Sequence, residues 1–147
     1  PLKDAVMAFD PDLQDPRHRL ISDPGCQQLV GYDTRFDATG ACRVTLEVGA
    51  QHLNRHGILH GGMVATVMDV VCGNTAAQYF DPEGHAAVVT VALNLSYIAA
   101  TGPGPVTATA EATGGGKSTA HVTGELKDTE GQLLATATGI FRRIRKR

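Results

Sequence analysis

Hydrophobic and polar side chains alternate along residues 42–48 of this chain. The apolar positions of that segment lie on one face: Cys42, Val44, Leu46 and Val48. A period of two predicts a β-strand with one buried face. The turn-forming run Asp-Ala-Thr-Gly at 37–40 stands just before it. We therefore expect a hairpin whose first strand covers residues 28–37.

Residues 63–79 show a different pattern, because they are apolar on nearly every side of a helix. Such a helix must be enclosed by other elements. Four alternating segments follow it, separated by turn-forming residues: 89–97, 106–113, 118–127 and 132–145. Two strands, one helix and a meander of four strands predict an α+β domain in which an antiparallel sheet wraps around the helix.

Residues 1–25 are rich in proline and in charged side chains. We expect them to form an N-terminal extension with a short helix at 12–20. The remaining residues, 26–147, then form one domain, which agrees with a length of 147 residues. No internal repeat divides this part of the sequence.

Charge and cysteine content narrow the choice of partners. The formal net charge of −2 provides no broad cationic field, so nucleic acid is not an expected partner. Three cysteines without C-x-x-C spacing argue against a disulfide framework or a thiolate zinc site. Together with the lack of a signal sequence at the start of the chain, they favour the cytoplasm.

The apolar run at 61–80 bears on membrane association and on assembly. It contains Asp69, Asn74 and Gln78, so it is a poor membrane span, and we expect no membrane partner. The predicted strands place many threonine and alanine residues on an outer sheet face. On a chain of this size, such a face favours a homo-oligomer.

The candidate chemistry begins where a polar loop meets the predicted helix, at Gly61 and Gly62. The first turn of a helix has unpaired N–H donors and a positive dipole end, which suits a carbonyl oxygen that becomes an oxyanion. Asp69 lies seven residues after Gly62 and is the sole charged residue between His60 and Asp81. A lone carboxylate is costly to bury unpaired, so it must face a partner group, a subunit interface or a wet cleft.

Three other patterns resemble functional motifs but lack features that those motifs require. His52, His56 and His60 fall at steps of four, but Gly57 and the loop composition argue against a helix there, so no metal site is expected. The run 116–118, Gly-Lys-Ser, lacks the earlier glycine of a phosphate-binding loop and joins two strands. No serine stands in a G-x-S-x-G pattern.

The combined pattern resembles the hotdog-fold acyl-CoA thioesterases, and it comprises Asn54, His60, Gly61, Gly62 and Asp69. The likeness is closest to the phenylacetate-pathway thioesterases and the small mitochondria-associated acyl-CoA thioesterases. It covers about residues 26–142 and includes the strand V-T-V-A-L-N-L-S-Y at 89–97. The resemblance implies a single hotdog domain that hydrolyses acyl- or aryl-CoA thioesters.

The resemblance also implies residue roles. The Gly61 N–H would polarise the thioester carbonyl, while His60 and Asn54 would hold that carbonyl or order the site. Asp69, reaching the site from the partner subunit, would be the general base or the nucleophile, and Thr90 would orient the attacking water. The substrate-binding positions implied by the resemblance are Gly62, Gly115, Gly116, Lys117, Arg142 and Arg143.

On the same grounds we expect no metal and no cofactor, since coenzyme A is part of the substrate. The expected assembly is a homodimer with shared active sites, further paired into a tetramer. Two alternatives stay open. One is a non-catalytic acyl-CoA sensor or structural subunit. The other is a hotdog enoyl-CoA hydratase, which the order of His60 before Asp69 disfavours.

Overall fold

The computed structural model describes residues 19–145 of the chain. Short elements come first: β1 (Arg19–Ile21), α2 (Cys26–Val30), β2 (Asp33–Phe36), β3 (Cys42–Val48) and the 3-10 helix η2 (Ala50–His52). One long helix follows, α3 (Gly61–Phe80). Four strands complete the chain: β4 (Val88–Tyr97), β5 (Gly104–Gly115), β6 (Thr119–Asp128) and β7 (Leu133–Arg143). The predicted helix and the four strands after it are confirmed, with small shifts at their ends.

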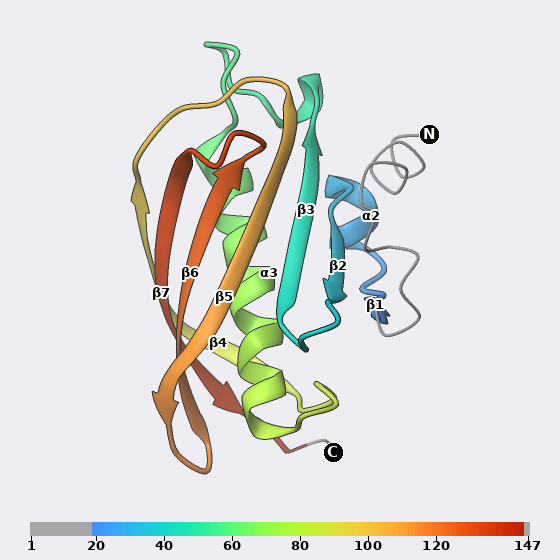
Figure 1. The fold of residues 1–147 in the computed structure, drawn as a ribbon, viewed down its shortest axis with the longest axis vertical. Helices are drawn as coiled ribbons and strands as arrows, with labels where there is room; N and C mark the ends of the chain where they lie inside the picture. The colour runs from blue at the N-terminus through green and yellow to red at the C-terminus, as the bar shows by residue number, and fades with distance from the viewer. Residues whose placement is uncertain (1–18, 146–147) are drawn as a thin grey trace.

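The strands form a seven-stranded sheet in the order β1-β2-β3-β5-β6-β7-β4, and every neighbouring pair is antiparallel. The strands curve around α3, which runs along the length of the domain (Figure 1). This is the α+β hotdog arrangement that was predicted. The meander of four strands was wrong, however. β5, β6 and β7 form a meander of three, whereas β4 crosses over to pair with β7 at the far edge.

The core lies between α3 and the concave face of the sheet. Alternate residues of β3 point toward the helix and are at most 2% exposed: Cys42, Val44, Leu46 and Val48. One side of α3 packs on them and on the other strands: Val64, Val67, Met68, Val71, Cys72, Thr75, Ala76 and Ala77. The prediction that other elements enclose the whole helix is therefore confirmed for the side that faces the sheet and for no other side in the described residues. The opposite side stays partly open, and many of its residues are small: Gly62, Ala65, Thr66, Asp69 and Gly73.

Two local predictions near the N-terminus were wrong. Residues 28–30 belong to α2, not to a strand, because the chain turns at Gly25 and Gly31, both with positive φ, and then enters β2. Residues 19–20 belong to β1 and not to a helix, since Arg19 and Leu20 pair with Phe36 and Arg35. The rest of the predicted helix at 12–20 lies outside the described residues.

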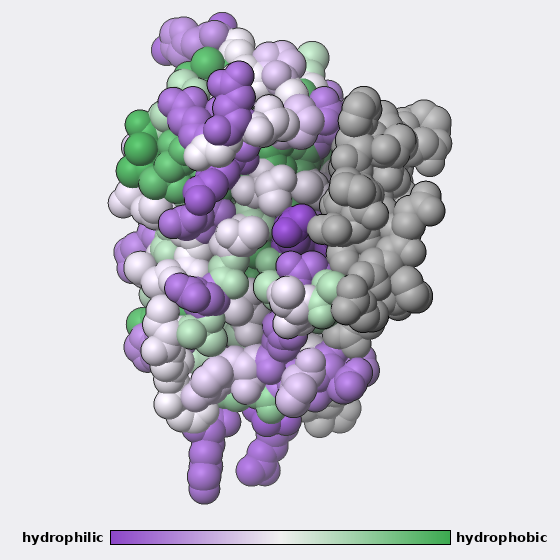
Figure 2. All heavy atoms as spheres, in the orientation of Figure 1, coloured by the Kyte–Doolittle hydropathy of each residue, from purple (hydrophilic) through white to green (hydrophobic). Residues whose placement is uncertain are grey.

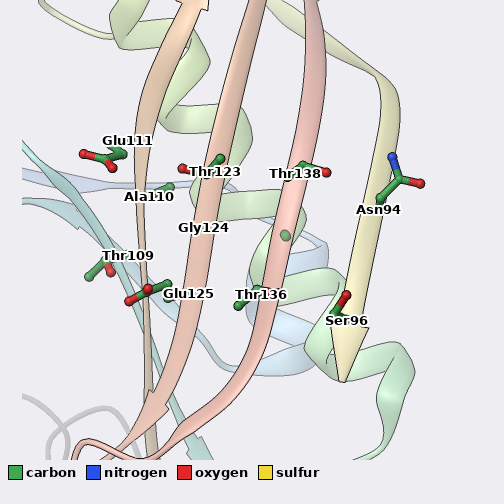
Figure 3. A pocket seen from close by; sticks show the side chains of 11 residues that line it. Asn94, Ser96, Thr109, Ala110, Glu111, Thr123, Gly124, Glu125, Thr136 and Thr138 are labelled. Atoms are coloured by element: carbon green, nitrogen blue, oxygen red, sulfur yellow. The ribbon is translucent and has the colours of Figure 1, made fainter. Parts of the chain in front are cut away.

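The convex face of the sheet is polar, as expected from its threonine content. A shallow depression of about 450 Å³ crosses β4, β5, β6 and β7 there. Figure 3 shows its side chains, which include Asn94, Glu111, Thr123, Glu125 and Thr138. In contrast, exposed hydrophobic residues gather on the edge strand and directly after it: Val89, Val91, Tyr97 and Ile98. The space-filling view is mostly polar, with hydrophobic atoms near one edge (Figure 2).

Candidate functional site

His60 caps the start of α3. Its backbone is extended, with φ −63 and ψ 135, and its Nδ1 accepts a hydrogen bond from the Gly62 N–H at 2.8 Å. The His60 carbonyl accepts from the amides of Met63 and Val64 at 2.9 and 3.2 Å. Within residues 19–145 the Gly61 N–H has no acceptor. The helix therefore begins with an unpaired donor at its positive end.

Asn54 orders the loop that leads into this helix. Its Oδ1 accepts from the amides of His56 at 2.9 Å and Ile58 at 3.4 Å. Asn54 and Gly61 line one cavity of about 300 Å³, whose other walls are largely apolar. Gly61 therefore lines a largely apolar recess at the start of α3, and Asn54 lines the same recess.

Asp69 lies on the open side of α3 and is half-buried. Its Oδ1 accepts a hydrogen bond from the Thr90 hydroxyl at 2.7 Å. The hydroxyl comes from β4, so strand and helix together hold the carboxylate in one orientation. Both residues line a second cavity, of about 330 Å³, which also contains Asp23 and Asn74. A carboxylate fixed by a hydroxyl and open to a cleft can accept a proton from water or attack an electrophile.

Within one chain the Gly61 N–H and the Asp69 carboxylate do not lie close together. Asp69 follows Gly61 by eight residues, which places the two Cα atoms about 12 Å apart along the helix axis. The two residues also line different cavities. A thioester carbonyl bound to the Gly61 N–H is therefore out of reach of the same chain's Asp69.

A third cavity, of about 760 Å³, is basic. Its cationic side chains are Lys117 from the β5–β6 turn, Arg143 at the end of β7 and Arg145 just after it, and its lining also includes His85 and one carboxylate, Asp81. The Arg143 guanidinium also lies over the ring of Phe80, 5.7 Å from its centroid. The predicted positions Lys117 and Arg143 are thus brought together.

The remaining predicted binding positions differ in their geometry. Neighbouring residues of a strand point to opposite faces, and Arg142 precedes Arg143, so it lies on the convex face and away from this cavity. Gly115 and Gly116 shape the turn before Lys117, with the Gly116 N–H donating to Thr119 at 2.8 Å. The Gly62 N–H is already used by His60.

The three spaced histidines do not form a metal site. His52 is buried, its Nδ1 accepts from the Gly49 amide at 3.0 Å, and its Nε2 lies 2.6 Å from the Val30 carbonyl. Its role is to tie η2 to α2, whereas His60 caps α3. Among residues 19–145, no three His, Cys, Asp or Glu side chains are arranged to hold a metal ion. No helix in the described range is long and apolar enough to span a membrane.

Two of the three thiols are inert by burial. Cys42 and Cys72 are at most 1% exposed, whereas Cys26 is exposed, and none forms a disulfide. Burial raises the pKa of Cys42 to about 12. Burial, followed by the nearby Asp69 carboxylate, raises the pKa of Cys72 to about 12. Neither buried thiol can therefore serve as a thiolate nucleophile at neutral pH.

Residues 56–135 match the family model of the thioesterase superfamily. The matched range contains Gly61, Asp69 and Thr90, and covers more than half of the chain. The chain belongs to the thioesterase superfamily. Membership supports thioester hydrolysis as its general chemistry, and it agrees with the hotdog fold described above. None of the curated proteins compared with the chain matches it.

Solved structures of similar proteins extend this finding. A conserved protein of Pseudomonas aeruginosa is 29% identical, with a TM-score of 0.72, over 84% of this chain and 95% of its own. A Bacillus halodurans protein solved with CoA is 25% identical, with a TM-score of 0.75, and the match covers 83% of this chain and 80% of that protein. A Ralstonia eutropha thioesterase-type protein, related to phenylacetic acid degradation, is 26% identical, with a TM-score of 0.71. The match covers 83% of this chain and 92% of that protein.

Sequence reasoning missed one residue at the candidate thioesterase site. The Tyr97 hydroxyl donates to the Gly61 carbonyl at 2.9 Å, and the ring lines the same cavity as Gly61. The predicted strand contained Tyr97, but its contact with a residue 36 positions away depends on the crossover of β4. The one available signal was an aromatic residue closing an otherwise aliphatic and polar strand. His85, which joins the basic cavity, was likewise missed.

Proposed function

We propose that this protein hydrolyses acyl- or aryl-CoA thioesters to the free acid and coenzyme A. The observation that carries the proposal is the unpaired Gly61 N–H at the start of α3, above an apolar recess. A thioester carbonyl is already electrophilic, so one amide donor and one carboxylate suffice for its hydrolysis. A positioned general base contributes on the order of 100- to 10,000-fold in rate.

In the proposed reaction the Gly61 N–H donates to the thioester carbonyl oxygen and stabilises the negative charge that develops there. Asp69 takes a proton from water, whose oxygen attacks the carbonyl carbon, and the C–S bond breaks. The proton then passes to the departing CoA thiolate. Direct attack by the carboxylate, with hydrolysis of the resulting anhydride, gives the same products. Thr90 keeps the carboxylate oriented through its 2.7 Å hydrogen bond.

We infer that the site is shared between two copies, because Gly61 and Asp69 are about 12 Å apart along one helix. A two-fold axis that crosses α3 near Ala65, midway between them, sets Gly61 of one subunit opposite the partner's Asp69. The small residues on the open side of α3 allow such an approach. The edge strand β4 offers a second contact, since one of its edges is unpaired in the described part of the chain and it exposes Val89 and Val91.

The basic cavity is the proposed place for the nucleotide phosphates of coenzyme A. Lys117 and Arg143 supply positive charge there, and Gly115 and Gly116 give the turn that presents Lys117. Arg142 is assigned no contact with the phosphates, because it lies on the convex face. That polar face, with its uncovered depression, is the proposed surface for pairing dimers into a tetramer. The proposed location is the cytoplasm.

The proposal is tested by thiol release from a panel of CoA thioesters. The panel runs from acetyl to palmitoyl and includes phenylacetyl, hydroxyphenylacetyl and benzoyl. The parent should release CoA from part of the panel, and Asp69→Asn should fold normally and lose most of this turnover. A folded parent that binds acyl-CoA without releasing thiol would instead support the sensor. Loss of enoyl absorbance without thiol release would support the hydratase.

A further inference from the structure

Tyr97 joins the edge strand to the first residue of α3. Its hydroxyl donates to the Gly61 carbonyl oxygen at 2.9 Å. Its ring covers Gly61, since a Cβ added at Gly61 would meet ring atoms at 3.4–3.5 Å. The side chain is nevertheless 57% exposed, so burial does not account for its placement.

The hydrogen bonds of Tyr97 and His60 act on the same peptide unit. The Gly61 carbonyl and the Gly62 N–H are the two polar ends of the peptide that joins these residues. Tyr97 holds the carbonyl, and His60 Nδ1 holds the N–H at 2.8 Å. A peptide unit is planar, so fixing both ends fixes the orientation of the whole plane.

This plane needs such fixing because it joins two glycines. Glycine has far more backbone freedom than other residues, and the N–H groups of the first turn of a helix have no acceptor within the helix. The adjoining peptide, between His60 and Gly61, carries the Gly61 N–H. Its carbonyl is held by the Met63 and Val64 amides, and its N–H has no acceptor among residues 19–145.

We propose that Tyr97 is a positioning residue: with His60 it clamps the Gly61–Gly62 peptide, which shares the Gly61 Cα with the adjoining peptide, and so limits the rotation of the Gly61 N–H that serves as the oxyanion donor. The inference rests on the proposed function, since an oxyanion donor matters only where a carbonyl is attacked. Tyr97 acts through backbone geometry and not through contact with the reacting atoms. It should therefore affect kcat more than substrate binding.

The test compares Tyr97→Phe, which keeps the ring and removes the hydroxyl, with Tyr79→Phe. Tyr79 is an exposed tyrosine at the other end of α3 and serves as the matched control. One neutral hydrogen bond corresponds to about a 3- to 10-fold fall in kcat for Tyr97→Phe. KM, and the affinity for a CoA thioether that lacks a carbonyl, should stay within about twofold. Tyr79→Phe should match the parent.

A second comparison separates positioning from general stability. Gly61→Pro removes the donor that Tyr97 is proposed to aim, so adding Tyr97→Phe to that variant should cause no further loss. Equal further losses in both backgrounds, or parental kcat in Tyr97→Phe, would overturn the inference and leave the thioesterase proposal standing. A parent with no turnover on any CoA thioester would overturn the proposed function itself.

An independent readout uses amide NMR of the ligand-free protein. The nitrogen shift of Gly62 senses the hydrogen bond to the Gly61 carbonyl, because the two belong to one peptide. Tyr97→Phe should move the resonances of Gly61 and Gly62, whereas Tyr79→Phe should leave them in place. Unchanged resonances in Tyr97→Phe would contradict the clamp whatever the activity of the protein.

Discussion

Gly61→Pro isolates the donor on which the proposed reaction depends. Proline lacks the backbone N–H, so it removes that donor and no side chain. Gly61 is the first residue of α3, where proline is well tolerated because this N–H has no partner within the helix. His60, with φ −63 and ψ 135, already has the extended backbone that a residue before proline prefers. The helix should therefore form normally.

Gly61→Ala is the matched control, because it adds a Cβ and keeps the N–H. That Cβ would come no closer than 3.4 Å to the Tyr97 ring, which is ordinary contact. Loss of one oxyanion donor costs about 100- to 1,000-fold in kcat, or about 2.7–4 kcal/mol. We expect this loss in Gly61→Pro, and a loss below about 10-fold in Gly61→Ala.

The assay is thiol release from the best CoA thioester of the parent, with a thermal melt of each variant. Both variants should melt close to the parent, since neither change removes a hydrogen bond of the fold. If Gly61→Pro keeps its fold and turns over as fast as Gly61→Ala, the Gly61 N–H is not the oxyanion donor. The proposed role of the helix start would then be wrong.

Two further predictions concern the carboxylate and the thiols. Thr90→Val keeps the side-chain shape and removes the hydroxyl that donates to Asp69. A hydrogen bond to a charged group is worth about 1.5–3 kcal/mol, and the solvent exposure of this bond favours the lower limit. We therefore expect kcat to fall about 10-fold. A thiol reagent at pH 8 should label Cys26 alone in the folded protein, because thiols with pKa values of about 12 stay protonated and Cys42 and Cys72 are buried.

Each of these predictions has its own control. Thr138→Val, on the convex face of the sheet, should keep parental turnover, and a fall equal to that of Thr90→Val would point to a general effect. Unfolding in denaturant should expose all three thiols to the reagent. Labelling of two or three thiols in the folded protein would contradict the burial described here. Cys26 itself reacts with the thiol reagent, so its labelling sets the background signal of the thiol-release assay.

The fold was largely predictable because its local patterns agree with its packing. The alternation at 42–48 survives in β3, where the helix-facing residues are buried in turn. The continuous apolar pattern of α3 predicted burial on every side. In the single chain the sheet covers one side, and the other side is open. The apolar pattern therefore predicted the helix and the side of it that packs on the sheet, but not that its other side lies open in the described residues.

The errors arose where pairing is set by distant residues. Alternation predicts that β4 is a strand, but it contains no information that β7 is its partner. For the same reason, the sequence could not distinguish Arg142 from Arg143 as a binding residue, although the two face opposite sides of the sheet. The family resemblance named Asp69 and Thr90 as site residues, whereas the hydrogen bond between them and the Tyr97–Gly61 contact required the structure.

The central claim is that the Gly61 N–H of one subunit and Asp69 of its partner act on one thioester. The most direct test is a mixed dimer of Gly61→Pro and Asp69→Asn subunits, isolated through two different tags. A shared site predicts that one of its two sites contains neither change, so the mixed dimer should show about half of parental turnover. If both groups act within one chain, every site carries a change. The mixed dimer would then be as inactive as the two variants alone, which would contradict the account.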